Sequence, residues 1–111
     1  MYGVGTRSDP VNSVSPAGST QTLLAGYMNK YTFTASTSCT FTLPPAIAGS
    51  SFTASFTQAS SGSAAVPTIN SAYYAGGVAP TWSTAANAKD IVVGYCDDGS
   101  TWQIVNGGIG Y

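Results

Sequence analysis

The chain has 111 residues, which is enough for one domain and too few for two domains of ordinary size. Only 6% of its residues are charged, against about 25% in an average soluble domain, and the formal net charge is −1. So few basic residues cannot neutralise a run of phosphates, and no apolar stretch is long enough to span a bilayer. We therefore expect neither a nucleic-acid partner nor a membrane partner.

Residues 1–19 contain glycine and proline among serine and asparagine, without any hydrophobic periodicity. This composition is typical of an extended arm, and it contains no apolar stretch of the kind found in secretory signals. Two of the few charges, Arg7 and Asp9, lie in it. A flexible terminus is the simplest interpretation. The alternative is an arm that crosses onto a neighbouring subunit, which makes Arg7 and Asp9 candidate interaction residues.

Residues 20–111 form the predicted β domain. Three of its segments, 30–35, 39–43 and 51–58, alternate between apolar and hydroxyl side chains. A period of two residues, with β-branched and aromatic residues enriched, is the signature of a strand that is buried on one face. The residues that we expect to point inward are Tyr31, Phe33, Ala35, Cys39, Phe41, Leu43, Phe52, Ala54 and Phe56.

The second half continues the strand pattern. Residues 66–69 are predicted as a short edge strand, because Pro67 cannot donate a hydrogen bond to a sheet. Residues 73–80 and 84–89 are predicted as loops.

The clearest local signal is a hairpin, with strands at 90–96 and 101–105 around the turn 97–100, where Gly99 supplies the DG step. Trp102 and Ile104 share one face of its second strand, and Trp102 is predicted to lie in the core. Short strands separated by frequent turns predict an all-β fold, namely a single small antiparallel β-sandwich or jelly-roll-like domain.

Two cysteines, Cys39 and Cys96, lie in predicted strands. We favour two buried thiols, because free cysteine behaves as a small hydrophobic residue. A disulfide between them is the alternative, since spacing in sequence does not place two Cα atoms within bonding range.

Residues suited to catalysis are scarce. The chain has no histidine, which is the commonest general base and the usual partner of a nucleophilic serine or cysteine. The adjacent carboxylates Asp97 and Asp98 fall in the predicted turn, where aspartate is a turn-forming residue. The pair Gly76 and Gly77 lacks the lysine and the strand–helix setting of a phosphate loop. We therefore expect no enzymatic activity, no cofactor and no metal.

Three aromatic residues in predicted loops, Tyr73, Tyr74 and Trp82, are the best candidates for an interaction surface. Exposed tyrosine and tryptophan can form a sugar-binding platform or the centre of a protein interface. Capping of the sandwich by the same side chains is an equally good interpretation.

Residues 76–102 read GGVAPTWSTAANAKDIVVGYCDDGSTW. This segment resembles a module of phage virion proteins, in which a GG-x-APT-x-S segment leads into a D-[IV]-[VL] strand and then a DG-[ST]-TW hairpin. The resemblance covers roughly residues 39–109. It implies a β-sandwich or jelly-roll fold, a trimeric state and a place in tail fibres, tail tips or head decorations. Within the segment, Pro80 fixes the entry of the strand and Gly99 its closing turn.

From composition and resemblance together we expect a virion structural protein, most simply a capsid decoration (cement) protein on the head exterior. It would be made in the host cytoplasm and assembled as a homotrimer on the lattice of the major capsid protein. One alternative is a tail-fibre or tail-tip component that binds a host surface glycan. A carbohydrate-binding module is the other alternative.

Overall fold

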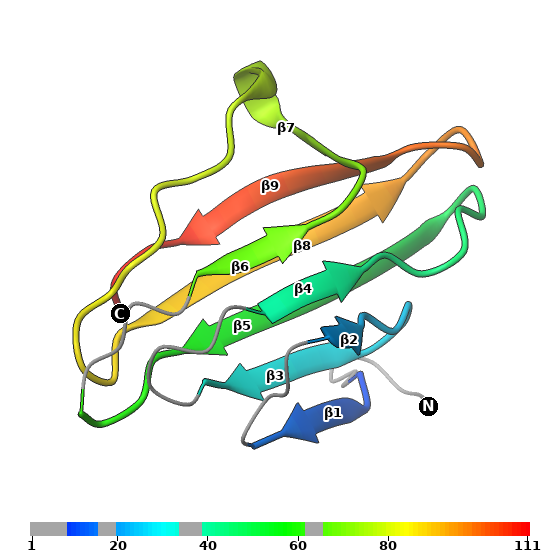
Figure 1. Cartoon of the computed structure of the whole chain (residues 1–111). Helices are drawn as coiled ribbons and strands as arrows, with labels where there is room; N and C mark the ends of the chain where they lie inside the picture. The colour runs from blue at the N-terminus through cyan, green and yellow to red at the C-terminus, as the bar shows by residue number, and fades with distance from the viewer. Residues whose placement is uncertain (1–8, 16–19, 34–38, 62–65) are drawn as a thin grey trace, which may run out of the picture.

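The computed structural model of this chain describes residues 9–15, 20–33, 39–61 and 66–111 (Figure 1). Within these residues the chain is all-β, apart from one short 3-10 turn, η1 (Ala75–Gly77). The strands are β1 (Val11–Val14), β2 (Thr20–Thr22), β3 (Met28–Thr32), β4 (Cys39–Thr42), β5 (Ser50–Thr57), β6 (Pro67–Ile69), β7 (Ala72–Tyr74), β8 (Lys89–Cys96) and β9 (Trp102–Gly108). They form a mixed six-stranded sheet, in the order β1-β3-β5-β8-β9-β7, and a parallel three-stranded sheet, in the order β2-β4-β6.

The first seven strands wind as a flattened coil, because each strand lies in the sheet opposite to the strand before it. In the large sheet β3 returns beside β1 and β5 beside β3. In the small sheet β4 returns beside β2 and β6 beside β4, and all four pairings are parallel. A parallel connection needs about a dozen residues or more. The connection from β1 to β3 spans residues 15–27 and contains β2, so the crossovers of one sheet build the other.

A hairpin completes the large sheet. Strand β8 pairs antiparallel with β5 on one side and with β9 on the other, and β7 lies parallel to β9 at the edge. Figure 1 shows β8 in orange beside β9 in red, with the small sheet in front of the large one. The hairpin predicted around residues 97–100 is confirmed.

The prediction of an all-β fold is confirmed, but the antiparallel sandwich is not what the chain forms. Five of the seven strand pairings are parallel. Alternation of side chains tells which residues point inward, but it is the same for parallel and antiparallel strands. Only the hairpin has a turn short enough to fix strand direction from sequence.

The core lies between the two sheets and is largely aromatic. The ring of Tyr31 meets Phe41 of the small sheet edge-on, with centroids 4.7 Å apart, and Phe41 lies 4.9 Å from Phe56. Phe33 stacks on Phe56 at 5.9 Å. The inward positions predicted from alternation are thus buried, apart from Leu43, which is half-buried against the core, and Ala35, which lies outside the described residues.

One polar side chain, Asn29, is fully buried within the coil. Its Oδ1 accepts hydrogen bonds from the backbone N–H of Leu24 at 3.0 Å and from Nδ2 of Asn12 at 3.1 Å. Its own Nδ2 donates to the backbone carbonyls of Leu24 and Thr53, at 3.0 and 3.2 Å. Because Asn12 and Asn29 are register partners on β1 and β3, the two amides stack from one turn of the coil to the next. Each is satisfied without a charged group.

Several local predictions can be compared with the structure. Strand β1 falls inside the range 1–19 predicted as an arm and pairs with β3, while residues 1–8 and 16–19 lie outside the described part. The edge strand predicted at 66–69 is confirmed as β6. The loop predicted at 73–80 is wrong at its start, because residues 72–74 form β7. Three residues are too few to show a period of two.

The two cysteines lie in different sheets. Cys39 opens β4 and Cys96 ends β8, and both are buried thiols rather than a disulfide. Burial raises the pKa of the Cys39 thiol above its ordinary value, so it stays protonated at neutral pH. The favoured interpretation of two small buried side chains is confirmed.

Candidate functional site

The turn between β8 and β9 is held by the carboxylate of Asp98. Its Oδ1 accepts hydrogen bonds from the backbone N–H groups of Ser100 and Thr101, both at 2.9 Å, and its Oδ2 accepts the Thr101 hydroxyl at 2.9 Å. These donors, led by the Ser100 N–H, lower the pKa of Asp98 from 3.8 to about 2. Gly99 has a φ of +76°, which glycine adopts without strain. Both residues are therefore turn formers.

A second aspartate, Asp90, ties the start of β8 to two other segments. Its side chain is only 3% exposed. Oδ2 accepts the backbone N–H of Ser83 at 2.7 Å, and Oδ1 accepts the backbone N–H of Gly110 at 2.9 Å. Next to it, Lys89 and Tyr111 exchange two backbone hydrogen bonds of 3.2 and 2.9 Å. The carboxylate thus fastens the loop before β8 and the last residues of the chain to the sheet.

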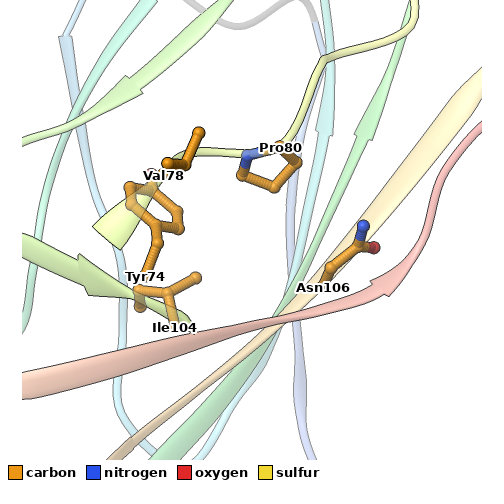
Figure 2. Close-up of a pocket in the computed structure, with 5 residues that line it drawn as sticks. All are labelled: Tyr74, Val78, Pro80, Ile104 and Asn106. Atoms are coloured by element: carbon orange, nitrogen blue, oxygen red, sulfur yellow. The ribbon is translucent and has the colours of Figure 1, made fainter. Parts of the chain in front are cut away.

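The loop that follows β7 covers part of the inner face of β9 and leaves an open pocket of about 200 Å³. The glycines Gly76 and Gly77 turn the chain here, with φ of +72° and +75°. In Figure 2, Tyr74 and Val78 lie side by side, and Asn106 of β9 lies across the gap from them. The lining residues are Tyr74, Val78, Pro80, Ile104 and Asn106.

The pocket combines apolar walls with two polar groups. Burial raises the pKa of the Tyr74 hydroxyl, which therefore remains protonated and able to donate a hydrogen bond. Oδ1 of Asn106 already accepts the backbone N–H of Gly108 at 2.8 Å, so its NH₂ group is the part that can serve a ligand. The volume is below the roughly 300–1,000 Å³ of pockets for drug-sized ligands. It suits one side chain or one sugar ring.

The structure does not gather the predicted interaction residues on one platform. Tyr73 is 59% exposed and Tyr74 half-buried, because consecutive residues of β7 point to opposite faces of the sheet. Trp82 is half-buried and meets Phe56 edge-on at 5.6 Å, which places it against the core. Only Tyr74 and Pro80 come together, in the pocket. Asp9 is exposed ahead of β1, and Arg7 lies outside the described residues.

Trp102 occupies the core, as its strand position predicts. It is 3% exposed, its ring lies 5.2 Å from Phe52, and its Nε1 donates a 2.9 Å hydrogen bond to the Pro44 carbonyl. The pocket residue that sequence reasoning missed is Asn106. Asn106 lies two residues after Ile104 and four after Trp102 on β9. Because strand side chains alternate with a period of two, this spacing predicts that the Asn106 amide points to the same face as Trp102 and Ile104. That spacing was the signal available in the sequence.

Two further features concern metals and membranes. In the part of the chain that the structure describes, no group of three or more cysteine or aspartate side chains is arranged to hold a metal ion. Across those same residues, no helix has the length and apolar character needed to cross a membrane.

Comparison with known proteins adds no relative: no protein-family model, no curated protein and no solved structure matches this chain.

Proposed function

We propose that this chain is a structural protein of a bacteriophage virion, most simply a capsid decoration protein on the exterior of the head. The observation that supports this most is how residues 76–102, the segment that resembles virion modules, fold. They form one continuous unit: the turn at Gly76 and Gly77, the loop held by Asp90, and the hairpin closed at Gly99. The glycines, Asp90 and Trp102 of the motif thus have roles in building the fold, which supports the proposal.

The surface of the domain also suits attachment to a protein lattice. Within the described residues, the charged side chains at the surface are few, namely Asp9, Lys30, Lys89, Asp97 and Asp98. Large apolar side chains such as Ile47 and Val78 are exposed beside many hydroxyl groups. A decoration protein binds through many copies, each burying a modest area. With so little charge, that binding should hardly respond to salt.

The experiment mixes labelled protein with undecorated heads, with isolated tails and with host cells, at about 0.05 and 0.5 M salt. Saturable binding to heads at both salt concentrations, with none to tails or cells, supports the proposal. Binding to none of the three would contradict it. Assembled heads and loose capsid subunits are compared in parallel, because a decoration protein recognises the geometry of the lattice.

A tail component that binds a host glycan is the second candidate, and the open pocket lined by the Tyr74 side chain favours it. Binding to cells that free sugars compete away would establish it in place of a head decoration. Tyr74→Phe removes only the hydroxyl in the pocket, and Tyr73→Ala removes the exposed ring on the opposite face of β7. Tyr111→Ala is the matched control, because Tyr111 is exposed and does not line the pocket.

A further inference from the structure

The outer face of the six-stranded sheet is the face turned away from the small sheet, and thus away from the viewer in Figure 1. Strand register places its side chains in rows that run across the strands. One row crosses five strands and is apolar apart from one threonine: Val11, Met28, Thr53, Val93 and Val105. The next row crosses four strands: Ser51, Tyr95, Gln103 and Tyr73. These two rows are called the outer face below.

Side chains at the middle of the outer face are open to solvent. Val93 is 37% exposed, Tyr95 42% and Val105 41%, although all three lie on β8 and β9, which each have a neighbouring strand on both sides. Strands that face water normally alternate apolar inward and polar outward. Here β8 carries Ile91, Val93 and Tyr95 outward, and its inward positions after Asp90 hold Val92, Gly94 and Cys96. Apolar residues on both sides are typical of a strand that is covered on both faces.

Charge on this side of the sheet is confined to one margin. Among the described strand residues, the charged side chains that point outward are Lys30 and Lys89, and both lie beyond the apolar row on the side opposite the tyrosines. We consider a two-fold axis that lies in the interface and runs perpendicular to the strands. It places the end of the face that carries Lys30 and Lys89 in one copy over the end that carries Tyr73 and Tyr95 in the other. Like charges are then kept apart, and lysine over an aromatic ring is a favourable contact. The face is therefore complementary to itself.

We propose that the outer face packs on the same face of a second copy of this chain, forming a two-fold sheet-on-sheet interface. Six strands at about 4.8 Å, over about 20 Å of strand length, give a face of roughly 600 Å² before side-chain relief is counted. A stable interface needs about 800 Å² of accessible surface from each partner. The flat area of this face is about three quarters of that requirement, and the relief of its side chains adds to it.

The geometry of the face also favours two copies over three. Two packed sheets lie about 10 Å apart, so each side chain has to reach about 5 Å from its sheet. Three sheets of about 29 Å width around a three-fold axis would leave the axis about 8 Å from each sheet. Thr53 and Val93, at the middle of the face, are too short to fill that space. The trimer expected from sequence would therefore have to use another surface.

Mass measurement by light scattering on the full chain tests this interface, and the test does not depend on any location in a virion. The wild type should give about twice the 11.2 kDa chain mass at micromolar concentration. Val105→Lys should give the monomer, with a dissociation constant raised by at least about 30-fold, because it puts a charge into the apolar row of the interface. Ile47→Lys, on an exposed loop away from the sheet, is the matched control and should remain a dimer.

A second measurement needs no variant. Hydroxyl-radical footprinting of the wild type over a dilution series should show Tyr95 protected at high concentration and exposed on dilution. Trp82, which packs against the inner side of the sheet, should react equally throughout. A wild type that is monomeric at about 100 μM, a trimeric mass, a folded Val105→Lys variant that stays dimeric, or Tyr95 reactivity independent of concentration would each overturn the proposal.

Discussion

The hydrogen bonds of Asp90 should make a sizeable contribution to the stability of the domain. Its two carboxylate oxygens each accept one backbone N–H, from Ser83 at 2.7 Å and from Gly110 at 2.9 Å. Asp90→Asn keeps the size and shape of the side chain but replaces one acceptor by an NH₂ donor. Whichever way the amide turns, one of these two part-buried N–H groups then faces another donor.

The expected cost follows from that single mismatch. Leaving one buried N–H without an acceptor costs about 1–3 kcal/mol, and hydrogen bonds to a charged acceptor lie in the upper part of that range. We therefore expect Asp90→Asn to lower the free energy of unfolding by about 2 kcal/mol. In a domain of this size about 1 kcal/mol corresponds to 4–8 °C in Tm, so the melting temperature should fall by about 8–16 °C.

The assay is thermal and urea unfolding at neutral pH, together with amide hydrogen exchange. In Asp90→Asn the N–H groups of Ser83 and Gly110 should exchange faster, because their acceptor is weakened. Asp97→Asn is the control: it removes the same charge from an exposed turn position where no side-chain hydrogen bond is found. If Asp90→Asn and Asp97→Asn melt within 1 °C of the wild type, the buried carboxylate does not hold these segments and the reasoning fails.

Substitutions at two further positions, Trp102 and Gly94, test the packing of β8 and β9. Trp102→Ala should destabilise the domain by about 3–5 kcal/mol. Trp102→Phe should cost less, about 1–2 kcal/mol, because it keeps one aromatic ring and loses the second ring and the hydrogen bond to the Pro44 carbonyl. Urea unfolding measures both, and equal costs would contradict this division. Gly94→Ala should cost about 1–3 kcal/mol, because the added Cβ would overlap the ring of its register partner Phe52. The double variant with Phe52→Leu should recover part of that loss, and strict additivity would show that the ring is not the obstacle.

Sequence alone predicted those elements whose signals are local. Residues such as Tyr31 and Phe33 point inward because alternation sets one face of a strand whatever its partner is. The final hairpin was predictable because the DG step fixes both the turn and the direction of the second strand. The same reasoning could not predict that the first seven strands form a coil of parallel neighbours. Parallel neighbours such as β1 and β3 are joined through the opposite sheet, so no short turn between them reveals the pairing.

The candidate site was predictable only in part, for a similar reason. Tyr73 and Tyr74 were grouped because they are adjacent in sequence, but adjacency within a strand sends them to opposite faces. The pocket joins Tyr74 to Asn106 only because β7 lies parallel to β9 at the sheet edge, a pairing of segments about thirty residues apart. Likewise the sequence analysis made no prediction for Asn29, because the hydrogen bonds that satisfy its buried amide come from the backbone of Leu24 and Thr53 in other segments.

Acid should weaken the fold through Asp98 in a defined range of pH. Its pKa is lowered to about 2 by the Ser100 and Thr101 donors, whereas the unfolded chain has the ordinary value of 3.8. A group with a lowered folded pKa stabilises the protein fully above its unfolded pKa, and this contribution is lost as the pH falls toward the folded value. The loss from Asp98 is therefore expected between about pH 4 and pH 2. Because the carboxylate is exposed, it should be only a part of the total acid sensitivity.

The measurement is the melting temperature of wild type and Asp98→Asn from about pH 6 to pH 2. The variant should be less stable than wild type at pH 6, since a neutral amide accepts the turn hydrogen bonds less strongly, and the two curves should converge below pH 4. Asp97→Asn, which changes the same charge one residue away, should keep the full acid-dependent decline. Curves for wild type and Asp98→Asn that stay parallel down to pH 2 would show that Asp98 titrates alike in the folded and unfolded chain. The turn would then owe its geometry to Gly99 and the strand register, and not to the carboxylate.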